Sequence, residues 1–375
     1  MTGSACPSGP AEFGSPAEKI WGIEILRFAS ALAVLVIHYR QHYVAIFPEM
    51  SGMTLSLPTW MSTLLWPFGF GSWAVSVFWI LSGYIFYHTY IQTIHGGRVS
   101  WRKFFWHRFS RLYPLHLLTL LLVVLLQFAL QAKTDLFNFS KNTPEKFALH
   151  LLMASNWFTS ERTFNVPIWS VSVEVLVYAG FFVFAKKLGP RILPVALLIL
   201  PCLWLNQYKR FEGGIIECAL FFFTGGLGWL LEQKVGQGLR LKVALAGVLG
   251  IILCWCLGWM NAPKTAILLG VPCLIVCLKY FFMKQERFSP FARRLGNLTY
   301  SSYLLHYPFS LLMVWIVLAL GIAPDLFLSP WVFGGIILMV LVLSHFCYEK
   351  FENPCQVTLR KIQPNPGNRR TDSSP

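Results

Sequence analysis

Apolar runs of about 20 residues recur along this chain from Trp21 to Tyr348. A helix rises 1.5 Å per residue, so a run of this length spans the ~30 Å hydrocarbon core of a bilayer. Because lipid offers no partner for a backbone N–H or C=O group, such runs must form helices or a closed barrel. The ~10-residue alternating segments typical of a barrel are absent from the sequence. The sequence therefore predicts an all-α, polytopic membrane protein.

Ten of these runs are expected to cross the membrane. They lie at about 21–41, 62–91, 112–131, 166–185, 192–206, 213–231, 243–260, 265–283, 298–320 and 330–348. The amphiphilic segment 145–157 is too short and polar to cross, so we expect a re-entrant or interfacial helix there. One transmembrane domain is expected over residues 19–354, with flexible tails at 1–18 and 355–375.

The charge distribution predicts the topology. The chain has 31 Lys and Arg against 16 Asp and Glu, a net charge of +15. Such an excess of positive charge can indicate nucleic-acid binding, but here the basic residues lie mainly in short loops between the apolar runs. With ten spans, 22 of them fall on the side of the two termini and 8 on the other, with Arg27 inside the first span. The positive-inside rule then places both termini in the cytoplasm. Membrane lipids are the expected partners of the basic loops, and no nucleic acid is expected.

The nine cysteines do not predict a metal centre. Most lie in apolar runs, and the pairs at 254/256 and 273/277 lack a matching second ligand set. Small, buried or lipid-facing side chains are the better interpretation, and no metal is expected.

Arg27 and His38 lie 11 positions apart in the first run. At 100° per residue, their side chains point within about 20° of each other and lie about 16 Å apart along one helix face. A long substrate could lie on that face, with its anionic end at Arg27 and its reactive end near His38. Charged groups within a bilayer usually mark function. The alternative is an arginine that snorkels to the headgroups and a histidine that only packs.

Other polar residues form similar local patterns. Ser82 and Gly83 are small enough to allow close helix approach. Arg108 and Arg111 are one helical turn apart and could clamp phosphate groups, although an ordinary basic loop would show the same pattern. Glu174 stands alone in an apolar run and needs a partner, for which Arg27 or His38 would serve.

Three further residues are candidates for the substrate side. Tyr303 and His306 are one turn apart at the start of the ninth span, where the alternative is a polar stripe that faces the bundle. Trp169 could stack on a sugar ring, or it could belong to the aromatic belt of the membrane interface.

In order along the chain, these motifs resemble the acyltransferase-3 family of integral membrane acyltransferases over about residues 19–355. The matching elements are Arg27-x10-His38, Phe78–Tyr84 ending in Ser-Gly-Tyr, Arg108-x-x-Arg111 with Tyr113-Pro114, Trp169-Ser-x-Ser-x-Glu174 with Tyr178, Tyr303-x-x-His306, and Phe351-Glu352-x-Pro354. Each motif alone is modest, but six in order between the right spans are specific.

The resemblance implies an O-acyltransferase of the bacterial cytoplasmic (inner) membrane. It implies transfer of an acyl group, usually acetyl from acetyl-CoA, to a hydroxyl of a cell-surface saccharide such as lipopolysaccharide O-antigen, exopolysaccharide or a glycolipid. Some members modify small molecules such as macrolides. Many members carry a further extracytoplasmic domain, and this chain is expected to act without one.

A mechanism follows as a hypothesis. His38 acts as general base or takes the acyl group itself, and Glu174 orients His38 or holds Arg27. The donor-binding set is Arg27, Arg108, Arg111 and Ser82. The oxyanion donor stays open among Ser82, Tyr303 and His306, and Trp169 is an acceptor-side candidate.

Two other classes of function would also place ionisable residues in such a sequence or leave them without a role. A proton-coupled transporter or flippase of a polysaccharide precursor would also bury Arg, His and Glu, but it predicts paired broken helices in two halves, and the sequence shows no such pairing. A catalytically silent scaffold would gain nothing from burying these ionisable groups.

Overall fold

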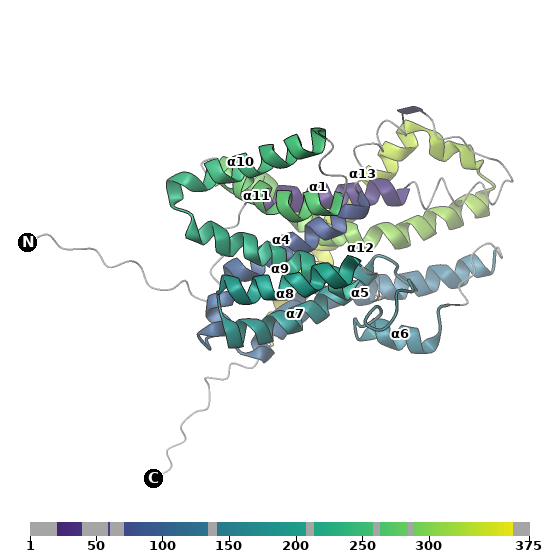
Figure 1. Ribbon diagram of the computed structural model, residues 1–375. Helices are drawn as coiled ribbons and strands as arrows, with labels where there is room; N and C mark the ends of the chain where they lie inside the picture. Colours follow the sequence, from purple (N-terminus) through teal and green to yellow (C-terminus); the bar gives the residue numbers. More distant parts are fainter. Residues whose placement is uncertain are drawn as a thin grey trace, which may run out of the picture.

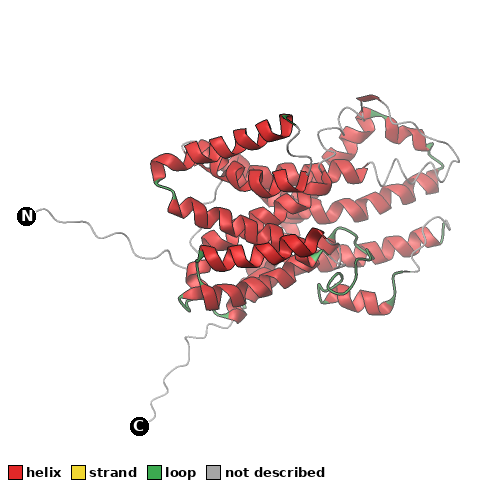
Figure 2. Ribbon diagram, viewed as in Figure 1, coloured by secondary structure: helices red, strands yellow, loops and turns green. Residues whose placement is uncertain are grey.

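The computed structural model describes residues 21–39, 59–60, 71–133, 141–207, 214–257, 263–283 and 288–362. Within these ranges the chain is helical and contains no strand (Figure 2). The long helices run side by side along one common direction (Figure 1). The elements are α1 Trp21–Tyr39, α4 Gly71–His95, α5 Trp101–Gln131, α6 Pro144–Leu151, α7 Ile168–Leu188, α8 Ile192–Gln207, α9 Ile215–Lys234, α10 Gln237–Cys256, α11 Pro263–Met283, α12 Ser289–Leu320, η3 Pro324–Leu328, α13 Pro330–Cys347, η4 Tyr348–Glu352 and α14 Asn353–Lys361.

These helices confirm the predicted all-α, polytopic fold. In the described part of the chain, 9 helices are long and apolar enough to cross a membrane, and α8 is a shorter apolar helix. The ten predicted runs coincide with these ten helices, although residues 40–41, 62–70 and 258–260 and the predicted tail 1–18 lie outside the described ranges. Which side of the membrane holds the termini stays a prediction.

Several helix ends differ from the sequence-based boundaries. α5 begins at Trp101 rather than near residue 112, with the Ser100 side chain accepting a hydrogen bond from the Lys103 backbone N–H. α12 begins at Ser289 rather than 298. Hydropathy misses such ends because a helix continues into the polar headgroup region, where its residues no longer need to be apolar.

Two smaller predictions are also corrected. The helix expected over 145–157 is α6, which has only 8 residues and ends at Leu151. A tail is expected from residue 355, but residues 355–361 belong to α14, which ends at Lys361; the rest of the expected tail, from residue 363, lies outside the described ranges. The indole N–H of Trp106 donates to the Leu359 carbonyl at 2.8 Å and ties α14 to the start of α5.

Small residues set the spacing of the helices. Gly83 on α4 lies against α9, where an added Cβ would collide with the Phe222 backbone oxygen. This contact agrees with the close approach expected for the Ser82-Gly83 pair. An aromatic core packs around this crossing, with large side chains that are almost fully buried: Trp79, Tyr84, Tyr87, Phe104, Phe181, Phe221 and Phe222.

α1 and α12 run side by side in the same direction. Near their first turns, Glu24 lies so close to Gly296 that a Cβ there would collide with the carboxylate. Further along, His38 lies beside His306. This parallel packing brings the two histidines together across the bundle.

Candidate active site

A cavity of about 250 Å³ lies inside the bundle, where α1, α4, α5, α7 and α12 converge. It gathers most of the site residues predicted from sequence, since its lining includes Arg27, Ser82, Arg108, Arg111, Glu174 and Tyr303. The other three, His38, His306 and Trp169, are not among its lining residues. The site therefore has two parts, a charged cavity and a histidine pair.

The cavity carries an excess of positive charge from three arginines. Arg27 pairs with Glu24 on its own helix, at 3.3 Å between Nη1 and Oε2. Arg108 donates from Nη2 to the Tyr90 hydroxyl at 2.7 Å, and its guanidinium lies 5.1 Å from the centre of the Phe86 ring. Its Nε is buried and has no hydrogen-bond partner among the described residues. A bound anion would satisfy that N–H, because an unpaired buried donor is costly.

Glu174 supplies a carboxyl group to the same cavity. Its carboxylate accepts hydrogen bonds from the Ser82 and Tyr178 hydroxyls and interacts electrostatically with Arg27 and Arg108. Of the two partners expected for Glu174, the structure therefore places Arg27 within its electrostatic reach. Its Oε1 has no hydrogen-bond partner in the described part of the chain.

His38 and His306 form a direct hydrogen bond. His38 Nδ1 lies 2.7 Å from His306 Nε2, and the rings are nearly parallel, with centres 4.9 Å apart. His306 Nδ1 lies 3.3 Å from the Ser302 carbonyl oxygen, which can only accept. The neutral His306 ring therefore carries its hydrogen on Nδ1 and accepts at Nε2. It follows that His38 donates from Nδ1 and carries its lone pair on Nε2.

Tyr303 connects the two parts of the site. It lines the cavity, and its ring centre lies 6.1 Å from that of His306. Its hydroxyl is 2.7 Å from Ser170 Oγ and 3.1 Å from the Pro167 carbonyl oxygen. Its single O–H hydrogen thus goes to one of these two acceptors. An oxyanion-binding role for Tyr303 would require that bond to break.

Trp169 lies outside the cavity lining and is held on two sides. Its ring meets Trp79 edge-on at 5.8 Å, and the Arg162 guanidinium carbon lies 4.9 Å from its ring centre. Arg162 also interacts electrostatically with His38 and Tyr303. One face of the indole is therefore occupied by a cation rather than open for a sugar.

Comparison with known proteins identifies the family of this chain. A family model described as an acyltransferase domain matches residues 20–349, which include every helix from α1 to α13. The chain belongs to the acyltransferase-3 family.

One curated relative agrees with this assignment. The acyltransferase MdmB of Streptomyces mycarofaciens is 30% identical over 159 residues, which cover 42% of this chain and 36% of MdmB. The match thus spans about a third of the relative's length. No solved structure matches this acyltransferase-3 protein.

Four charged residues near the site of this acyltransferase-3 protein were not identified as site residues from sequence. Glu24 lines the cavity, Arg162 interacts with His38, and Arg360 on α14 is close enough to act electrostatically on Arg108 and Arg111. Glu352, which entered only as part of a motif, interacts electrostatically with Arg111 and Arg27. Arg162 lies in a loop and Arg360 lies in the segment assigned to a tail. Neither position indicates a site residue in the sequence, because only the packing of the helices brings these charges near the cavity.

Proposed function

We propose that this protein is an O-acyltransferase that moves an acyl group, foremost acetyl, from cytoplasmic acyl-CoA to a hydroxyl of a cell-surface saccharide or glycolipid. The observation that carries the proposal is a cavity with three arginines that adjoins, through Tyr303, a pair of hydrogen-bonded histidines. Such a site could bind an anionic acyl donor next to an acceptor that carries a hydroxyl group.

The arginines of the cavity bind the acyl donor. Arg108 and Arg111 bind the CoA phosphates, because guanidinium groups match phosphate oxygens in a bidentate fashion. Arg27 guides the donor toward the face of α1 that leads to His38. Glu174 holds Arg27 and Arg108 in place through its charge.

The histidine pair, His38 and His306, catalyses the chemical step. His38 Nε2 takes the proton of the acceptor hydroxyl, whose oxygen attacks the thioester carbonyl carbon. The C–S bond then breaks, and the CoA thiolate receives the proton from His38. His306 stabilises the intermediate His38 imidazolium, because its Nε2 accepts the hydrogen bond that His38 donates from Nδ1. A covalent route would use the same Nε2 atom to take the acyl group first.

The oxyanion needs a positive charge or a donor near the thioester carbonyl. The Tyr303 hydroxyl and the His306 N–H are bonded to protein acceptors, and the Ser82 hydroxyl is bonded to Glu174. We therefore add Arg162, which acts electrostatically on His38 and Tyr303, as the candidate for this role.

The place of action is proposed as the bacterial cytoplasmic membrane, with the donor entering from the cytoplasm and the acceptor from the outer side. The family assignment and the asymmetric distribution of basic residues support this orientation. The acyltransferase name of MdmB supports acyl transfer, and the saccharide acceptor rests on the family resemblance.

The deciding experiment uses purified protein in nanodiscs with radiolabelled acetyl-CoA. With a saccharide added to supply the acceptor hydroxyl, or with water in its place, wild type should release CoA, and His38→Ala should lower that rate by roughly 10²–10⁴-fold, the usual contribution of a general base. Donor binding and elution as a folded protein should persist in the variant. Label bound to wild type but not to His38→Ala would assign the covalent route. A folded wild type that neither binds nor consumes acetyl-CoA would refute the acetyl-donor assignment.

A further inference from the structure

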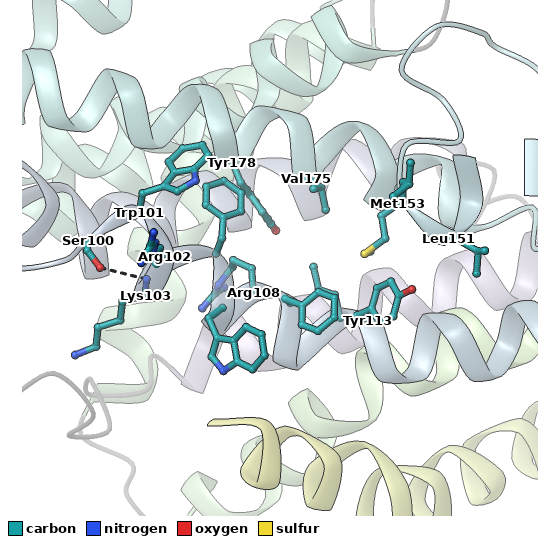
Figure 3. Close-up of a pocket in the computed structure, with 15 residues that line it drawn as sticks. Ser100, Trp101, Arg102, Lys103, Arg108, Tyr113, Leu151, Met153, Val175 and Tyr178 are labelled. Atoms are coloured by element: carbon teal, nitrogen blue, oxygen red, sulfur yellow. Dashed lines mark hydrogen bonds between the residues drawn. The ribbon is translucent and has the colours of Figure 1, made fainter. Parts of the chain in front are cut away.

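A second and larger hollow, of about 1090 Å³, lies between α5, α7 and the end of α6 (Figure 3). Its walls are mostly apolar and aromatic, and the side chains that line it include Trp101, Phe105, Trp106, Phe109, Tyr113, Leu151, Leu152, Met153, Val175 and Tyr178. Trp101, Phe109 and Leu152 are 46%, 38% and 72% exposed. The hollow is thus a groove that opens onto the outer surface of the bundle, where lipid would lie; it is called the lateral groove below.

Apart from Arg108, which also lines the reaction cavity, the lateral groove carries its charged side chains at one end. Arg102 and Lys103, in the first turn of α5, line its basic end, whereas Leu151, Met153 and Val175 line its other end. The positive end of the α5 helix dipole adds to the same charge. A molecule that fits must therefore have an anionic head and an apolar tail.

The dimensions of the lateral groove match one leaflet. From Trp101 to Tyr113, α5 rises about 18 Å at 1.5 Å per residue, while half of the hydrocarbon core is about 15 Å thick. The basic end lies at the start of α5, on the side predicted to be cytoplasmic. Anionic lipids are enriched in that leaflet, where they attract Lys and Arg near the surface.

The lateral groove adjoins the reaction cavity. Arg108, Leu112 and Tyr178 line both spaces, so these side chains form a wall that the groove and the cavity share. Arg108 and Tyr178 are also two of the residues that interact with Glu174. Whatever fills the groove therefore packs against the side chains that hold the charged cavity together.

We infer that the lateral groove binds one anionic glycerophospholipid of the cytoplasmic leaflet. Its phosphate lies on Arg102 and Lys103, and one acyl chain runs past Phe109 and Tyr113 toward Met153. The lipid closes the side of the cavity and supports Arg108 and Tyr178 from outside. Apart from the shared wall at Arg108, this site is separate from the proposed donor and acceptor positions, and it does not depend on acetyl-CoA being the donor.

The test measures lipid binding rather than activity. Purified protein is titrated with phosphatidylglycerol or phosphatidylcholine, and bound lipid is counted by native mass spectrometry. Wild type should hold one phosphatidylglycerol in preference to phosphatidylcholine. Arg102→Gln/Lys103→Gln should weaken that binding roughly 30-fold, the loss expected for two surface cations near an anionic lipid.

A matched control uses Lys186→Gln/Lys187→Gln. These two exposed lysines end α7 at the same end of the bundle, because Phe182 on that helix contacts Trp101, and they do not line the groove. This control should bind phosphatidylglycerol like wild type. A second variant, Val175→Trp, fills the groove and should lose the tight lipid while keeping both cations.

Three results would overturn the inference: equal binding of both lipids, equal weakening in the control pair, or a tight lipid retained by folded Val175→Trp. If Val175→Trp does not elute as a folded protein, the headgroup comparison and the two charge variants decide the matter by themselves.

Discussion

The hydrogen bond between His38 and His306 joins residues 268 positions apart in the chain. His306 holds the His38 ring by accepting its Nδ1–H, while its own Nδ1–H is bonded to the Ser302 carbonyl. We therefore propose that His306 positions His38 and stabilises its charged form, as the partner of a metal-bound or catalytic histidine does.

Substitution of His306 separates this positioning role from a purely structural one. His306→Ala should lower kcat for acyl transfer by about 10–100-fold, the usual effect of losing such a partner, with little change in the KM for the donor. His306→Gln should recover much of the rate, because its carbonyl oxygen can accept from His38. Steady-state kinetics of both variants give the answer. Equal losses in the two variants, or a loss confined to KM, would contradict the assignment.

At the scale of the helices, the crossing of α4 and α9 depends on a glycine. Gly83→Ala places a methyl group against the Phe222 backbone oxygen, so the helices must separate, at a typical cost of about 1–3 kcal/mol. We expect a clearly lower melting temperature. Gly180→Ala on α7 is the matched control, because a Cβ there meets nothing within 4 Å. Thermal unfolding in detergent measures both variants, and equal melting temperatures would show that the contact is not restrictive.

The short helix α6 is attached to α5 through His150, which is 1% exposed. His150 Nε2 lies 3.0 Å from Thr163 Oγ1, and its carbonyl accepts from His116 at 2.8 Å. Burial, with a smaller contribution from His116, lowers the pKa of His150 from 6.5 to about 3. The ring is therefore neutral in the folded protein at pH 7.

This pKa predicts a loss of stability in acid. Below pH 6.5 His150 binds a proton in the unfolded chain, whereas in the folded chain it binds one only near pH 3. The free energy of unfolding therefore decreases as the pH falls through this window, by about 2 kcal/mol at pH 5. Removing the titrating group in His150→Gln should make the fall in melting temperature between pH 7 and pH 5 smaller than in wild type. An identical fall in both proteins would mean that His150 does not titrate as the structure indicates.

At the scale of the whole molecule, both ends of the described chain lie at one end of the bundle. Arg293 at the start of α12 lies over the ring of Trp21, and α14 is bonded to the start of α5. This arrangement agrees with an even number of crossings. We predict that this end faces the cytoplasm.

Reporter fusions test that orientation. Green fluorescent protein fused after the C-terminus should fluoresce, and alkaline phosphatase at the same point should stay inactive, because it folds only outside the cytoplasm. Fusions after Lys133, at the far end of α5, should give the opposite pattern. The reverse result at both positions would invert the topology and with it the proposed side of donor entry.

The sequence alone determined the number and approximate place of the membrane helices and four of the five charged residues that line the cavity. Hydropathy is a local property, so the ten runs could be read without knowing how they pack. Arg27, Arg108, Arg111 and Glu174 were identifiable because a charge in an apolar run, or an arginine pair one turn apart, is a local signal.

Only the tertiary structure decided which of these residues act on one another. The His38–His306 bond, the approach of Arg162 and Arg360 to the site, and the lateral groove beside Arg108 all join segments distant in sequence. No local pattern specifies such contacts, because they depend on helix crossings that close packing fixes over the whole bundle.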